Sequence, residues 1–275
     1  MRRKVIVLSA VLAILSGLVR AETKKLVLPV AVEERFVSGR WPRYTTIMRV
    51  VNRGTESAQL ALAAYDNSGA LLSNVRFLSG DGSDPIRVQT DRPNVIVMIV
   101  EDDPIFEGWV EITVDEEADI LVTAELKFFG EDIEGSVYDS HDVLGMVQVP
   151  ARPPSTQHHG FTQVTLIDGK KVVSLSAYAF VNPNDQHASV EATYVELYST
   201  EVKTRGFVLP PRGRSAQLLT ELFQGVVPDI NITPPRVIVL LGSLEVRSDV
   251  PIGVGAIDLL LPEGRLSGGV MEPVN

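Results

Sequence analysis

One block of alternating apolar and polar residues occurs twice in this chain. The first copy, Gly108 to Leu126, reads GWVEITVDEEADILVTAEL, and the second, Gly242 to Leu260, reads GSLEVRSDVPIGVGAIDLL. An overlay without a gap aligns a glycine, a glutamate, an aspartate and the final leucine. Each copy alternates with a period of two residues, breaks at a polar corner (Asp115 or Asp249), and alternates again. The pattern predicts a strand, a tight turn and a second strand in both copies.

The stretches before these hairpins repeat as well. Asn52 aligns with Asn182, an offset of 130 residues, and Gly108 aligns with Gly242, an offset of 134. A register kept over two separated blocks indicates a duplication. Alternating strands need one buried and one solvated face, so each copy is predicted to fold as an immunoglobulin-like β-sandwich. The predicted fold is all-β, with domains at residues 22–149 and 161–275 and a proline-rich linker at residues 150–160.

Residues 1–21 have the pattern of a secretory signal peptide. A positive cluster at residues 2–4 precedes an apolar run from Val5 to Val19, and Ala21 provides a small residue at the cleavage position. The run is shorter than the ~20 residues that span a bilayer as a helix. We therefore expect bacterial export to the periplasm or the medium, with no membrane span after cleavage. A retained N-terminal anchor is the alternative.

Charge and cysteine content limit the partners and the source of stability. Cleavage after Ala21 removes four positive charges and no negative ones, which takes the formal net charge from −10 to −14. An acidic surface repels nucleic-acid phosphates and anionic lipid headgroups, so no nucleic-acid partner is expected. The chain has no cysteine, so disulfides cannot stabilise it and buried apolar area has to do so.

Two further stretches carry local signals. Pro29 lies in the predicted strand Lys25–Val32, and because proline removes a backbone donor, this strand is expected at a sheet edge or with a bend. Ser215–Phe223 places leucines and a phenylalanine on one helical face, and Gly225 follows as a stop. We expect one short helix there, packed against the second sandwich.

Several motifs of the chain resemble a known family. They are Leu28-Pro29, Trp41 with Thr45 and Val50-Val51-Asn52, Tyr65-Asp66 with Gly69, LPPRGRSAQLLTELF at Leu209–Phe223, and GSLEVRSDVPIGVGAI at Gly242–Ile257. The motifs resemble secreted bacterial proteins with tandem immunoglobulin-like β-sandwich repeats, generally of unknown function. The resemblance implies the fold and export, and it implies no catalytic or ligand-binding residue. The first copy lacks a clear counterpart of the Leu209-Pro210-Pro211 segment, so the two copies need not share one function.

The sequence lacks the common catalytic and metal-binding patterns, and no catalytic residue, cofactor or metal is predicted. It has no G-x-S-x-G elbow, no P-loop and no H-E-x-x-H motif. His158 and His159 are adjacent, so on an extended chain they point in opposite directions, and a solvated linker is favoured over a metal site. The acidic segment Glu131–Asp142 offers oxygen ligands for calcium, but its spacing fits no calcium loop, which favours a solvated loop.

An aromatic and basic cluster is the candidate ligand-binding site. It consists of Arg40, Trp41, Arg43 and Tyr44 in a long predicted loop. Exposed aromatic rings beside cationic donors suit a sugar or a protein partner. The interpretation we favour is that Trp41 covers one end of a sandwich, because large aromatic residues are mostly buried. Trp109, at the start of a predicted strand, is expected in the core or at a sheet rim.

The predicted function is therefore that of a secreted or periplasmic, non-enzymatic structural or adhesive protein with a protein or glycan partner. A carbohydrate-binding protein that uses Trp41 and Tyr44 is the first alternative. A periplasmic assembly chaperone, which needs an open sheet edge, is the second. An enzyme would require a carboxylate pair that no sequence pattern identifies.

Overall fold

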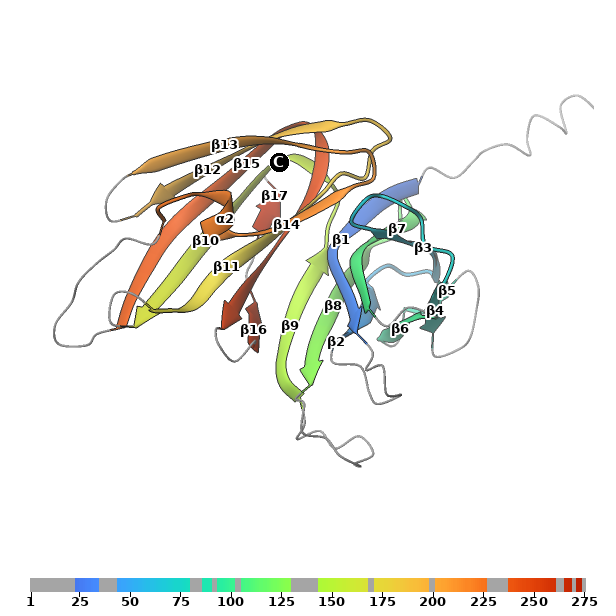
Figure 1. Ribbon diagram of the computed structural model, residues 1–275. Coiled ribbons are helices and arrows are strands. Elements are labelled where there is room, and N and C mark those ends of the chain that lie inside the picture. Colours follow the sequence, from blue (N-terminus) through green and yellow to red (C-terminus); the bar gives the residue numbers. More distant parts are fainter. Residues whose placement is uncertain are drawn as a thin grey trace, which may run out of the picture.

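In its described residues the protein is almost entirely antiparallel β, as the sequence predicts, with one four-residue helix among them (Figure 1). The computed structural model describes residues 23–34, 44–79, 86–90, 93–101, 105–129, 143–167, 171–197, 201–226, 237–260, 265–268 and 271–273. Within these ranges, no helix has the length and apolar character needed to cross a lipid bilayer. The predicted signal peptide lies outside the described residues.

The N-terminal half, residues 23–151, forms a sandwich-like arrangement of nine strands. They are β1 (Thr23–Glu34), β2 (Tyr44–Asn52), β3 (Ala58–Asp66), β4 (Val75–Ser79), β5 (Ile86–Val88), β6 (Asn94–Val100), β7 (Ile105–Asp115), β8 (Ile120–Phe129) and β9 (Val143–Ala151). One layer has the order β4-β6-β2-β8-β9 and the other β1-β7-β3-β5, and the pair Glu34–Tyr44 links them. Their inward-facing side chains form one apolar core.

The C-terminal half, residues 155–273, repeats this strand order. Its elements are β10 (Ser155–Ile167), β11 (Lys171–Val181), β12 (Ala188–Glu196), β13 (Val202–Leu209), β14 (Arg214–Leu218), α2 (Leu219–Leu222), β15 (Val237–Leu260), β16 (Arg265–Gly268) and β17 (Met271–Pro273). The order β10-β15-β12-β13 corresponds to β1-β7-β3-β5, and β14-β11-β15-β16 corresponds to β6-β2-β8-β9. A second apolar core lies between these layers.

The predicted strand, turn and second strand are found in the first copy, but they form no hairpin, because β7 pairs with β1 and β3 and β8 with β2 and β9. In the second copy the prediction is wrong, because β15 is one continuous strand of 24 residues. Its first part pairs with β10 and β12 in one layer, and its second part pairs with β11 in the other. β15 therefore occupies the positions that β7 and β8 occupy in the N-terminal half. Gly108 pairs with Asp66 and Gly242 with Glu196, which confirms the overlay before the corner. Beyond the corner Val51 pairs with Leu121 but Val181 with Gly253, so the overlay slips by two residues where β15 omits the turn.

Three local predictions have mixed outcomes. β1 lies at a layer edge and has a bulge between Leu28 and Ala31, as Pro29 predicts. The predicted helix is only Leu219–Leu222, because the residues before it pair as β14 with β11. The stretch predicted as a linker lies largely in β9 and β10, with residues 152–154 between them.

Candidate functional site

The two halves meet in a close-packed contact, here termed the joint. β1 of the N-terminal half packs on β11 and β15 of the C-terminal half. A Cβ atom at Gly253 would lie 2.5 Å from Val27 Cγ1, and one at Gly255 would lie 2.5 Å from Pro29 Cγ. Ala179 of β11 belongs to the N-terminal apolar core. Small residues on β11 and β15 therefore let the β1 backbone approach closely.

An aromatic pair forms the centre of the joint. Trp109 projects from β7 and is fully buried, and its ring stacks on Tyr65 of β3 with centroids 4.5 Å apart. The Trp109 Nε1–H donates to the backbone oxygen of Arg212 at 2.9 Å. Val27 and Val181 complete this apolar cluster. The prediction that Trp109 lies in a core or at a sheet rim is confirmed, and the structure adds that the C-terminal half covers it.

The turn Pro210–Gly213, between β13 and β14, positions the arginine. Gly213 N–H donates to Pro210 O, and Arg212 N–H donates to Asn184 O at 2.9 Å. Arg212 has a φ of 57°, a left-handed conformation that is uncommon for a residue other than glycine. The side-chain amide of Asn182 donates to Pro210 O, which fixes the turn to the end of β11. Backbone contacts thus hold Arg212 in a conformation that it would rarely adopt alone.

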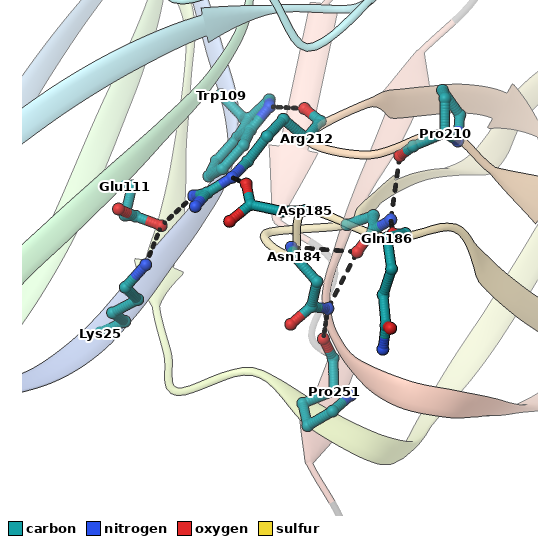
Figure 2. Close-up of polar contacts among 10 residues, drawn as sticks. Lys25, Trp109, Glu111, Asn184, Asp185, Gln186, Pro210, Arg212 and Pro251 are labelled. Atoms are coloured by element: carbon teal, nitrogen blue, oxygen red, sulfur yellow. Dashed lines mark hydrogen bonds and ion pairs between the residues drawn. The ribbon is translucent and has the colours of Figure 1, made fainter.

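The Arg212 side chain connects both halves through charge (Figure 2). Its Nη1 lies 2.8 Å from Glu111 Oε2 on β7, and its Nε lies 2.7 Å from Asp185 Oδ1. Glu111, which is 8% exposed, also accepts from Lys25 Nζ at 3.0 Å. The guanidinium carbon lies 5.7 Å from the Tyr65 ring centroid. Two cations and two carboxylates therefore alternate across the joint.

A second arginine of the same segment is more deeply buried. The Arg214 side chain is 3% exposed and donates to Pro29 O, Asn67 Oδ1 and Glu107 Oε1 at 2.7–2.9 Å. Its backbone N–H donates to Asn67 O. A buried guanidinium requires partners for its donors, and all of these partners belong to the N-terminal half. Arg214 thus ties β14 to that half.

A polar groove opens beside the Arg212 contacts. It has a volume of about 430 Å³ and is lined by Lys25, Pro183, Asn184, Asp185, Gln186 and Arg212. The Asn184 amide donates to Asn182 Oδ1 and to Pro251 O, so it is held in place (Figure 2). Asp185, with a side chain 85% exposed, reaches into solvent apart from its bond to Arg212. Four of the lining residues thus already have polar partners: Arg212 and Asp185 bond each other, Lys25 bonds Glu111, and Asn184 bonds Asn182 and Pro251.

The contacts of the joint shift the pKa values of two of its residues. The hydrogen bond from Arg212 and its charge lower the pKa of Asp185. Burial raises the pKa of Tyr65, and the charge of Glu111 adds to that effect. The lowered pKa keeps Asp185 ionised, the form that its ion pair with Arg212 requires.

The structure leaves the predicted ligand-binding cluster untested. Arg40, Trp41 and Arg43 lie outside the described residues, as does the acidic segment Glu131–Asp142. Tyr44 begins β2 and pairs with Phe128 through its backbone, and its side chain is outside the described part. Among the described residues, no group of three or more His, Asp or Glu side chains is placed to hold a metal ion.

The histidine pair is only partly as predicted. His158 and His159 point in opposite directions, as expected on an extended chain, but both lie in β10 and not in a linker. His158 is buried, and its Nε2 contacts Ile252 O at 2.9 Å and Ser155 O at 3.2 Å. The prediction of a solvated His158 is wrong, because its strand pairs with β15 and the ring faces the core. Burial lowers the pKa of His158.

No family model, no curated protein and no solved structure matches this chain. The joint residues therefore have to be interpreted from their own geometry. Sequence reasoning missed Glu111, Arg212 and Arg214 as a group. The available signal was the Leu209-Pro210-Pro211 segment, which is present in the second copy alone and precedes both arginines.

Proposed function

We propose that this chain is an exported, non-enzymatic structural or adhesive protein built from two immunoglobulin-like sandwiches that act as one rigid body. The proposal rests on the contacts across the joint. Trp109, Arg212 and Arg214 make partly buried polar contacts across it, and these contacts hold the sandwiches at a fixed relative position. A rigid pair of sandwiches presents the loops at its ends with constant spacing, which suits recognition of an extended partner.

Export supports this role and has a direct test. The full chain, with a C-terminal tag, is expressed in a bacterial host, and the mass of the accumulated protein is measured in each cell fraction. We expect the protein in the periplasm or the medium, with Glu22 as its first residue. Accumulation of the uncleaved chain in the cytoplasm or the inner membrane would contradict the export part of the proposal.

The binding role is tested on the same preparation. Partners are captured by cross-linking in the envelope fraction, and the purified protein is screened on a glycan array and against a panel of hydrolase substrates. Capture of one envelope protein supports the structural or adhesive role. Glycan binding that disappears in Trp41→Ala would favour the carbohydrate-binding alternative instead. Substrate turnover would contradict a non-enzymatic function.

A further inference from the structure

Two surfaces meet at the joint, one from each half. Because the halves share a strand order, each of these surfaces has an equivalent surface on the other half. In the N-terminal half, the joint covers the part of the outer face of β1, β7 and β3 that carries Val27, Trp109 and Tyr65. The strand order places the equivalent outer face of the C-terminal half on β10, β15 and β12. In Figure 1 these strands lie in the left part of the picture, and β1, β7 and β3 lie at the right.

The C-terminal face carries a group of exposed apolar side chains at one end and polar side chains, among them Glu245 and Arg247, at the other. Its residues Val195 and Ser243 pair with each other, as Tyr65 and Trp109 do in the joint. Phe161 pairs with Ser243 and is 73% exposed, and its ring lies edge-on to the His159 ring at 6.0 Å. The neighbouring exposed apolar side chains are Leu197, Val202 and Val239. Several exposed apolar side chains on neighbouring strands are typical of an interaction surface.

The N-terminal half has the second exposed face, which also carries the Arg49–Glu125 ion pair. In the joint, the C-terminal half contributes Val181 and Gly253, which pair across β11 and β15. The equivalent pair on β2 and β8 is Val51 with Leu121, and these side chains are 39% and 42% exposed. Val95 of the neighbouring strand β6 is 40% exposed on the same outer face. This N-terminal face therefore corresponds strand for strand to the surface that the joint buries.

We propose that the C-terminal face of one chain binds the N-terminal face of a second copy of the same chain, so that the two faces meet in the same strand-to-strand arrangement as in the joint, without its tryptophan and arginine contacts. The two faces differ from each other, so the contact is heterologous. A row of bound copies has a free C-terminal face at one end and a free N-terminal face at the other. Association is then head-to-tail and open-ended. The inference concerns self-assembly and does not depend on export.

The intermolecular contact is weaker than the joint. Leu121 and Thr123 stand where the joint has Gly253 and Gly255, so larger side chains keep the two backbones further apart. Burial of apolar side chains such as Phe161 and Leu121 provides the main attraction, which is insensitive to salt screening. Assembly is therefore expected to depend on protein concentration and to persist at high ionic strength.

Sedimentation velocity over a concentration series tests this proposal on the protein isolated from the compartment where it accumulates. The wild-type protein is expected to sediment faster as its concentration rises, at low and at high salt. Phe161→Asp places a charge in the C-terminal face and Leu121→Asp places one in the N-terminal face, so each variant loses one binding surface. Each is expected to remain monomeric on its own. Leu71→Asp, at a leucine that is 65% exposed and lies on neither face, is the matched control and should associate like the wild type.

A mixture of the two variants gives the sharpest result. Phe161→Asp keeps its N-terminal face and Leu121→Asp keeps its C-terminal face, so an equimolar mixture should form dimers and nothing larger. A wild-type protein that stays monomeric at every concentration would overturn the proposal. A mixture that stays monomeric, or single variants that still associate, would also overturn it. Circular dichroism checks the fold of each variant, and the serine substitutions at both positions replace any aspartate variant that fails to fold.

Discussion

Arg212 combines a rare backbone conformation with contacts to both halves, so its side chain and its backbone can be tested separately. We expect Arg212→Asn to keep the left-handed turn, because asparagine tolerates positive φ, and to lose the bonds to Glu111 and Asp185. The free energy of unfolding should fall by about 2 kcal/mol, the scale of a hydrogen bond to a partly buried charge. Urea denaturation measures this change.

The control for that substitution is a surface arginine. Arg53 pairs with Asp119 at 2.7 Å, but both side chains are more than half exposed. Exposed ion pairs contribute little to stability, so Arg53→Asn should leave the denaturation midpoint almost unchanged. An equal loss of stability in both variants would show that Arg212 contributes no more than a surface charge. The inference that its bonds stabilise the joint would then be wrong.

Two aspartates of β15 are expected to have opposite effects on the pH dependence of stability. Burial raises the pKa of Asp258 above 3.8, although Ser176 donates a hydrogen bond to it at 2.7 Å. The backbone N–H of Ser189 bonds to Asp249 and lowers its pKa below 3.8. The folded state therefore holds the Asp258 proton more tightly than the unfolded state does, and the Asp249 proton less tightly.

The sign of each effect follows from this linkage. The contribution of Asp258 is present below pH 3.8 and is lost as the pH rises through its folded pKa, so Asp258→Asn should gain stability relative to wild type towards pH 7. The contribution of Asp249 is present above pH 3.8 and is lost on acidification, so Asp249→Asn should be less stable than wild type at pH 7 and similar to it in acid. Thermal unfolding at several pH values measures both differences, and curves of the same sign would contradict the assignment.

At the scale of elements, the contact of β1 with β15 depends on glycine. A Cβ at Gly255 would lie 2.5 Å from the Pro29 ring, which cannot move aside without disturbing the bulge of β1. Gly255→Ala should lower the free energy of unfolding by about 1–3 kcal/mol, as overpacking of a close contact does. Gly206→Ala is the control, since the nearest atom to its Cβ would be 3.9 Å away. Chemical denaturation compares the two, and equal stability would mean that β1 and β15 are not closely packed.

Sequence periodicity was sufficient for the strands and insufficient for their connections. Alternation around Val110, Ile112 and Val114 predicts β7 correctly, because a strand with one buried face needs that pattern. The same alternation in β15 does not reveal whether a turn interrupts it, since Pro251 is compatible with a turn and with a strand that changes layers. The helix prediction failed for a related reason: Ser215–Leu218 can pair with β11, and this tertiary contact outweighs helical spacing.

The joint itself was beyond sequence reasoning, because it depends on which outer faces meet. Trp109 points away from the core of its own half, and a tryptophan on an outward strand position is a signal that something covers it. The sequence does not show what covers it. Glu111 and Arg212 are 101 residues apart, and neither belongs to a local motif that predicts the pair.

At the scale of the whole molecule, the two halves are expected to unfold together. Ala179 of the C-terminal half belongs to the N-terminal core, and Ile257 packs against that core, so separating the halves exposes apolar surface of both. In a Trp41→Phe background the single remaining tryptophan, Trp109, reports on the joint. Its fluorescence and the far-ultraviolet circular dichroism should then show one coincident transition in urea. A fluorescence change at lower urea than the loss of β-structure would mean that the joint opens while the halves stay folded. The protein would then be two hinged sandwiches, and the fixed spacing that supports the proposed function would not exist.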